Sequence, residues 1–272
     1  MAVPVFSGLS YAFLYSIGVF GILNSEINFN AWKSVLTDFY FWKSILFSLY
    51  VGILSVSISS ILSFLIAIRW RSNFKSGLLS YVIYLPLCFP ATVVAFFIFQ
   101  MFSQSGFVSR ITNYLQITDG ISNFPVLIND TLGIGIIFTM ILLISPFFII
   151  LFSAVYESER IDELSDLGST LGASKSQIMK KIVIPILFRK TVVSLILFIL
   201  FVMGNYEVPL LLGGQNPQLI SVAIVQKITR FNLYDIPNGF AMSIIYVTFL
   251  IVLLGFLAIK NPNFFATKEH ND

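Results

Sequence analysis

Acidic side chains gather in one polar stretch of this chain, residues 156–186, which is flanked by long apolar runs. Among its first eleven residues one is basic, Arg160, and five are acidic: Glu157, Glu159, Asp162, Glu163 and Asp166. Apolar residues recur between them at spacings of three and four: Ile161, Leu164, Leu167 and Leu171. This pattern is typical of an amphipathic helix. An anionic membrane surface repels acidic helices, so the stretch favours a protein partner with a basic, apolar-lined groove.

Residue types that usually carry catalysis are scarce. The chain has one Cys, Cys88, one His, His270, and no G-x-x-x-x-G-K-[ST] loop for ATP phosphates. It offers no Ser–His–Asp set, no carboxylate pair at a plausible depth and no Cys cluster for a metal. We therefore expect a protein that is not an enzyme, with no catalytic residue, metal site or cofactor of its own.

A second polar group, Asn205, Tyr206 and Glu207, lies in an otherwise apolar run. Ionisable residues inside membrane spans are costly and often mark the path of a solute. One interpretation is therefore a pore or gate site that contacts a cationic solute. The alternative is a position near the outer interface, where the carboxylate is paired or simply hydrated.

Two short helices are predicted over 158–186. Gly172 suits the left-handed position that ends a helix, and Ser174 to Gln177 matches a capping box that starts the next one. Met179, Ile182, Val183 and Ile186 form the apolar face of that second helix. Pro185 is expected to stop or kink it where the chain turns into the next apolar run.

Composition places these elements in a membrane protein. The chain is 57% hydrophobic and 11% charged, with a mean hydropathy of +0.90, whereas soluble domains carry about 25% charged residues. The apolar runs are continuous, which favours helices over a barrel. We predict an all-α integral membrane protein in a single domain, residues 1–272. Six runs are long enough to span a bilayer: 5–23, 45–68, 78–102, 132–155, 191–212 and 240–259.

The first run is interpreted as an uncleaved helix rather than a signal peptide, because residues 1–3 hold no Lys or Arg and no small-residue cleavage site follows. The outer loops 103–131 and 213–239 are long, and a short surface or re-entrant helix is expected at 217–231.

Basic residues predict the orientation, since cytoplasmic loops are enriched in Lys and Arg. With both chain ends in the cytoplasm, eleven of the 16 basic residues face inward: Arg69, Arg71, Lys75, Arg160, Lys175, Lys180, Lys181, Arg189, Lys190, Lys260 and Lys268. The other five face outward: Lys33, Lys43, Arg110, Lys227 and Arg230. This orientation places 156–186 in the cytoplasm.

The stretch 156–186 resembles the EAA loop of the inner-membrane permease subunits of binding-protein-dependent ABC importers. The signature reads EAA, three residues, Gly, nine residues, I-x-L-P. Here Asp166, Leu167 and Gly168 stand at the EAA triplet, Gly172 at the glycine and Ile182 to Pro185 at the end. Residues 85–99 are similar to the proline-containing third or fourth span of this family. Residues 124–137 and 205–217 look like the polyamine, ferric-iron and thiamine-type branch of these permeases.

The resemblance implies a type I ABC importer fold and a multi-pass protein of the bacterial inner membrane. It implies several partners: two ABC ATPase subunits that hold ATP and Mg²⁺, a second permease, identical or homologous, and an extracytoplasmic solute-binding protein. Membrane lipid surrounds such a protein, and no nucleic acid is expected. The solute would be a polyamine, metal ion, thiamine-like molecule or oxyanion. The residues implied in ATPase coupling are Leu164, Asp166, Leu167, Gly168, Leu171, Gly172, Ala173, Ile182 and Pro185.

Two other classes of membrane protein are alternatives. A secondary transporter driven by an ion gradient usually carries buried acids and internal repeats, and this sequence has almost no acids within its apolar runs and no visible repeat. A membrane anchor without transport would need neither the proline-containing spans nor the patterned cytoplasmic stretch.

Overall fold

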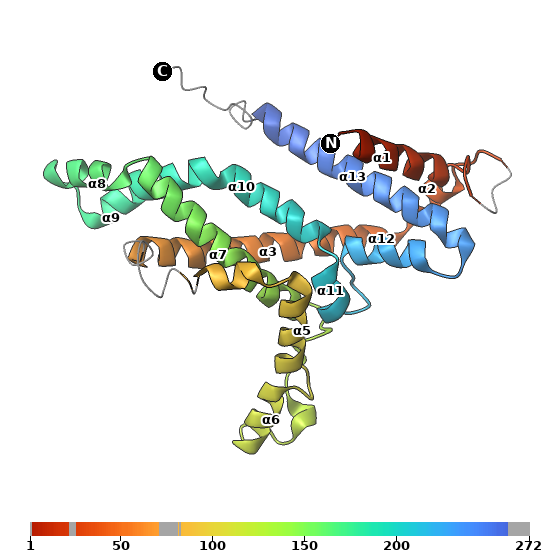
Figure 1. The fold of residues 1–272 in the computed structure, drawn as a ribbon, viewed down its shortest axis with the longest axis horizontal. Coiled ribbons are helices and arrows are strands. Elements are labelled where there is room, and N and C mark those ends of the chain that lie inside the picture. The colour runs from red at the N-terminus through yellow and green to blue at the C-terminus, as the bar shows by residue number, and fades with distance from the viewer. Residues whose placement is uncertain (1, 22–25, 71–80, 82, 261–272) are drawn as a thin grey trace. The chain divides into compact units, whose positions relative to one another are not determined.

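All regular elements in the computed structural model are helices, over the residues it describes: 2–21, 26–70, 81 and 83–260 (Figure 1). A helix satisfies its own backbone hydrogen bonds, which a segment surrounded by lipid requires. Within these residues, five segments are long and apolar enough to cross a membrane: Phe39–Trp70, Ala91–Tyr114, Ile134–Ser158, Lys175–Gly204 and Leu233–Gly255. The predicted all-α membrane architecture is confirmed.

The first predicted span, 5–23, corresponds to a shorter helix than expected. Helix α1 (Ala2–Ser16) has 15 residues, or about 22 Å of length, against a bilayer core of roughly 30 Å. It ends because Gly18 takes a left-handed φ of +84°, and the Val19 N–H then donates back to the Leu14 carbonyl (3.0 Å). Residues 22–25 of this run lie outside the described part.

The chain divides into two compact units, of which the first comprises Met1–Ser48 and Pro217–Asp272. It holds α1, α2 (Asn30–Thr37), the start of α3 (Phe39–Trp70), α12 (Ile220–Thr229), the 3₁₀ turn η5 (Leu233–Asp235) and α13 (Ile236–Lys260). Helix α13 packs against α1, α2 and α12.

Helix α12 confirms the short helix predicted at 217–231. Its first N–H group, on Ile220, donates to the Ser48 hydroxyl at 2.8 Å, which satisfies one of the free donors of the helix start. Gly239 of α13 lets the two helices approach closely, because a Cβ there would lie 2.6 Å from Ile228 of α12.

The second unit comprises Leu49–Asn216. After the rest of α3 come η2 (Leu85–Cys88), α5 (Ala91–Phe102), α6 (Phe107–Tyr114), η3 (Ile121–Asn123), α7 (Ile134–Ser158), α8 (Ile161–Thr170), α9 (Lys175–Ile178), the π-helical turn η4 (Met179–Val183), α10 (Ile184–Gly204) and α11 (Glu207–Leu212). Helix α7 lies at the centre and packs against α5, α10 and α11.

Two predicted spans of this unit are interrupted. The predicted span 78–102 is broken at 89–90, between η2 and α5, and its start at 78–80 lies outside the described residues. The predicted span 191–212 is broken at 205–206, where α10 ends and α11 begins. Sequence hydropathy averages over both breaks, because the residues on either side are apolar.

Candidate functional site

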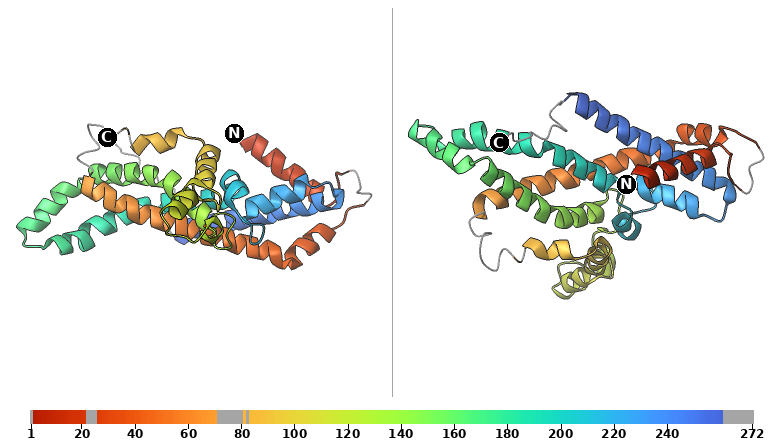
Figure 2. Two further views of the ribbon diagram at one scale, coloured as in Figure 1. Left: turned by 90° about the horizontal axis from the view of Figure 1, so that it is seen from below. Right: turned by 45° about the horizontal axis from the view of Figure 1, so that its top comes forward.

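Helices α8 and α9 form a hairpin at the end of the second unit, at the tips of α7 and α10 (Figures 1 and 2). The chain enters it through Arg160, which takes a left-handed conformation (φ +48°). The base is tied by an ion pair between Lys190 Nζ and Glu159 Oε1 at 2.6 Å. The Tyr156 hydroxyl also donates to Asp162 Oδ1 at 3.4 Å. These links fix the direction in which the hairpin leaves α7.

Gly172 ends α8 as predicted. Its φ is +83°, a conformation that disfavours residues with a Cβ atom. The Gly172 N–H donates to the Ser169 carbonyl (3.0 Å), and the Ala173 N–H donates to the Gly168 carbonyl (3.0 Å). Both bonds together make a Schellman motif, so the turn after α8 has a defined geometry.

The predicted capping box starts α9. The Gln177 N–H donates to Ser174 Oγ at 3.4 Å, and the Ser174 N–H donates to Gln177 Oε1 at 2.8 Å. Two otherwise free backbone donors are satisfied reciprocally. Only one residue, Ala173, separates this cap from the left-handed Gly172, which leaves the connection little freedom.

Glycine at position 168 has a packing reason. A Cβ atom on Gly168 would lie 3.3 Å from Ile182 and 3.4 Å from Ile178, so the bare backbone of α8 faces the second helix closely. Ile161, at the start of α8, is fully buried. Ile161 and Gly168 therefore lie on the packed side of α8, as expected for a short helix that packs on one side.

The leucines of α8 face outward. Leu164, Leu167 and Leu171 are 38%, 60% and 88% exposed. The sequence pattern grouped them with Ile161 on one broad apolar face. Ile161 is the buried member of that face, and Gly168 packs against Ile178 and Ile182. Asp166 is exposed as well, so the free surface of the hairpin is both acidic and apolar.

Pro185 does not stop the second helix, which was the first of the two predicted outcomes, a stop or a kink. The segment Lys175–Gly204 runs as one helix of 30 residues, with a π-helical turn at Met179–Val183 directly before Pro185. Pro185 lies in the first turn of α10, after this change of hydrogen-bond register. Ile182, within the π turn, packs near Gly168. The hairpin and the spanning helix α10 are therefore continuous.

The other end of α10 is followed directly by Asn205, Tyr206 and Glu207. The Val208 N–H donates to Asn205 Oδ1 at 3.1 Å, which caps α11. Glu207 is exposed and lies in the first turn of α11, where a carboxylate is favourable near the helix dipole. Asn205 and Tyr206 are half-buried.

Sequence reasoning missed the contacts that anchor the hairpin. The Glu159–Lys190 pair and the Gly168–Ile178 contact join residues too far apart for helical spacing to indicate them. The break at 205–206 did carry signals: Gly204 and Asn205 stand at the end of α10, and Pro209 is near the start of α11, as is usual for proline.

Residues 59–264 match the family described as binding-protein-dependent transport system inner membrane component. A curated relative from Sinorhizobium fredii (strain NBRC 101917 / NGR234), described as probable ABC transporter permease protein y4oQ, is 25% identical over 253 residues, covering 90% of this chain and 81% of the relative.

Two solved structures share the fold. One is a bacterial ABC transporter involved in the import of the acidic polysaccharide alginate, with a TM-score of 0.62, 19% identity, and coverage of 95% of this chain and 90% of that one. The other is a bacterial alginate ABC transporter in complex with an alginate pentasaccharide-bound periplasmic protein, with a TM-score of 0.60, 19% identity, and coverage of 93% and 86%.

Proposed function

Because this chain belongs to the family of binding-protein-dependent transport system inner membrane components, we propose that it is the membrane-spanning permease subunit of an ABC importer. In this role it receives a small solute from an extracytoplasmic binding protein and passes it to the cytoplasm by alternating access. It lies in a bacterial inner membrane with both ends in the cytoplasm. ATP is hydrolysed on two separate ATPase subunits, and a second permease, identical or homologous, completes the pore.

The α8–α9 hairpin is the observation that carries this proposal. Its turn is fixed by Gly172 and the Ser174 cap, and its base by the Glu159–Lys190 pair. A fixed turn transmits a rigid-body displacement, whereas a flexible connection would absorb it. The exposed leucines and Asp166 offer the ATPase an apolar contact and a charge for a basic group.

Helix continuity supplies the route from the hairpin to the pore. The helix Lys175–Gly204 contains 30 residues, or about 45 Å of length. One end belongs to the hairpin, and the other ends at the polar break that holds Glu207. Gly52 of α3 approaches this helix closely, since a Cβ there would lie 3.1 Å from the Ile199 carbonyl oxygen. A displacement of the hairpin therefore reaches the break without crossing a loop.

The break at 205–207 is the proposed solute contact. Its exposed Glu207 carboxylate suits a cationic solute, such as a polyamine, a metal ion or a thiamine-like molecule, better than an oxyanion. The structurally similar importers take alginate, which is acidic, and the same carboxylate would repel such a substrate. This argument favours the polyamine, ferric-iron and thiamine-type branch.

The test uses the chain reconstituted in vesicles with its ATPase and binding protein. Leu167→Asp places a charge on the exposed hairpin face. We expect it to abolish binding-protein-stimulated ATP hydrolysis and to reduce co-purification of the ATPase, because a carboxylate cannot enter an apolar groove unpaired.

Leu115→Asp is the matched control, because Leu115 is 59% exposed and Leu167 is 60% exposed. It lies after α6, in the loop predicted to face outward, and should keep both readouts at the level of the original protein. Full coupling in Leu167→Asp, or equal losses in both variants, would refute docking through the hairpin.

A further inference from the structure

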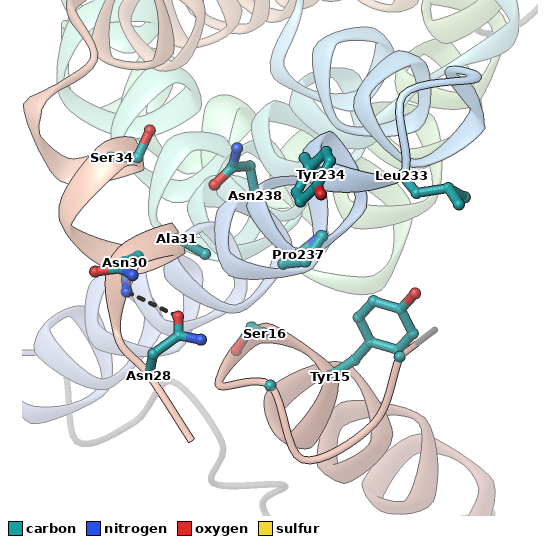
Figure 3. A pocket seen from close by; sticks show the side chains of 12 residues that line it. Tyr15, Ser16, Asn28, Asn30, Ala31, Ser34, Leu233, Tyr234, Pro237 and Asn238 are labelled. Atoms are coloured by element: carbon teal, nitrogen blue, oxygen red, sulfur yellow. Dashed lines mark hydrogen bonds between the residues drawn. The ribbon is translucent and has the colours of Figure 1, made fainter. Parts of the chain in front are cut away.

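A cavity of about 390 Å³ lies within the first unit, between the end of α1, the α2 region and the start of α13 (Figure 3). Its volume is in the range of small-molecule sites. Among the described residues, 12 line it, and none of these is an Asp, Glu, Lys, Arg or His. Lys227, on α12, is paired with Asp235 at 3.4 Å instead of lining the cavity. A charged ligand would therefore enter without a counter-charge.

Several polar side chains that line the cavity have no hydrogen-bond partner among the described residues. The side chains of Asn30, Ser34 and Asn238 make no hydrogen bond within the described part of the chain. Asn28 differs, because its Nδ2 donates to the Glu26 carbonyl (3.2 Å) and its Oδ1 accepts from the Asn30 N–H (3.3 Å). The amides of Asn30 and Asn238 and the hydroxyl of Ser34 can each donate and accept hydrogen bonds. They therefore suit a ligand whose own groups, such as hydroxyls, also donate and accept hydrogen bonds.

Two tyrosines complete the lining. Figure 3 shows Tyr15 and Tyr234 on one side of the cavity and Asn28 and Asn30 on the other. Tyr234 is 72% exposed, and the Tyr15 ring is held against Phe240 with centroids 4.7 Å apart. Aromatic rings provide a flat apolar face with a polar edge. Amides opposite a ring fit a molecule with hydroxyl groups on its rim and C–H groups on its face.

We propose that this cavity binds a small neutral polyhydroxylated ligand of the sugar or polyol class. The ligand is either a free sugar or the sugar headgroup of a membrane glycolipid, which share this chemistry. With both chain ends in the cytoplasm, as proposed above, the cavity opens on the extracytoplasmic side. Only the side on which it opens rests on the proposed function. Binding itself follows from the lining and is independent of the transported solute.

Trp32 provides a reporter at the cavity wall, because its Nε1–H donates to Ser16 Oγ at 3.0 Å and Ser16 lines the cavity. With Trp42→Phe and Trp70→Phe, Trp32 is the remaining tryptophan of the three. The full chain is placed in phosphatidylcholine nanodiscs, without glycoside detergents, and titrated with glucose or glucuronate. We expect a saturable change in Trp32 emission with glucose, and binding of glucuronate at least about tenfold weaker. Calorimetry on the unsubstituted chain repeats the measurement.

A second arm distinguishes the source of the sugar. Nanodiscs containing a glycolipid with one glucose headgroup are compared with phosphatidylcholine nanodiscs, without free sugar. A Trp32 shift that only the glycolipid produces identifies a headgroup site, whereas a response to glucose alone identifies a free-sugar site. Both results support the proposal.

Paired variants on α2 test the lining. Ser34→Val should weaken binding at least about tenfold, because a ligand hydroxyl loses its hydrogen-bond partner. Thr37→Val, three residues further along the same helix and outside the lining, should bind like the parent. The proposal is overturned if neither arm shows a saturable response, if glucuronate binds as well as glucose, or if the two variants behave alike. None of these readouts involves ATP hydrolysis, so failure here leaves the permease proposal separately testable.

Discussion

The two ends of the helix Lys175–Gly204 are built in opposite ways. At the hairpin end, the left-handed Gly172, a capping box and a glycine–isoleucine seam fix the backbone by local contacts. At the other end, α10 stops at Gly204, and a single side-chain cap from Asn205 starts α11 beside an exposed carboxylate. The first construction suits the transmission of a displacement. The second presents an exposed carboxylate, on Glu207, that a solute could meet. Substitutions at each end should therefore affect different steps of transport.

Among substitutions that test the construction of these two ends, the largest effect is expected for Gly172→Val. A side chain at this position meets no atom within 4 Å, so the cost is conformational, about 1–2 kcal/mol for a left-handed residue with a Cβ atom. Hydrogen exchange of 161–178 should accelerate roughly 5- to 30-fold, and stimulated ATP hydrolysis should fall while membrane insertion persists.

Gly172→Asn is its control, since asparagine tolerates the left-handed region. Nearly normal exchange and coupling are expected for it. If valine were as well tolerated as asparagine, the conformation of Gly172 would not matter to the hairpin.

Glu207→Gln should act at the other end of the helix. It removes one charge without changing the shape of the side chain, which is worth about 1 kcal/mol or roughly fivefold in apparent affinity for a cation. Uptake by vesicles should show a higher KM for a cationic solute, with normal ATPase binding. Unchanged transport kinetics would leave Glu207 as a hydrated residue near the interface.

Ser174→Ala removes the capping hydroxyl of α9. The expected destabilisation of the hairpin is about 0.5–1 kcal/mol, measured as faster amide exchange at the start of α9. Ser176→Ala, two residues away, is the comparison. If both serines gave the same exchange rates, the cap would contribute nothing beyond helix propensity.

The smallest effect is expected for Lys190→Met. The pair with Glu159 is partly exposed, at 51% and 32% of the two side chains, so its contribution should stay below about 1 kcal/mol. Coupling should weaken slightly, and the difference from the parent should vanish at high salt because exposed charges are screened. A loss as large as that of Gly172→Val would show that the base of the hairpin, not its turn, limits transmission.

The same two ends differ in how well the sequence predicted them. Gly172 and the Ser174–Gln177 box were predicted correctly, because backbone conformation and capping depend on neighbouring residues. The break at 205–206 was missed, although Asn205 and Pro209 signalled it, because the apolar run seemed continuous through it. The early end of α1 at Gly18 was missed for the same reason.

Helical spacing in the sequence could not predict contacts between residues that lie far apart along the chain. Helical spacing grouped Ile161 with the leucines of α8, but which side of that broad apolar face is buried depends on where α9 packs. Gly168 stands where the EAA signature has its last Ala, and a Cβ atom there would lie 3.3–3.4 Å from Ile182 and Ile178, so the glycine has a steric reason that the pattern did not indicate. The roles of the exposed residues, including Asp166 and Glu207, still stand as predictions.

The separation of inward and outward residues on α8 has an evolutionary consequence. Ile161 and Gly168 maintain the fold of the hairpin, while Leu167 and Leu171 are largely exposed. Exposed positions tolerate most substitutions with little change in stability. With the proposed docking through the hairpin, the outer residues would be able to diverge between paralogous transporters in one cell, giving each its own ATPase partner, while the inner residues are retained. Exchanging only these outer residues between two paralogues should exchange their partners.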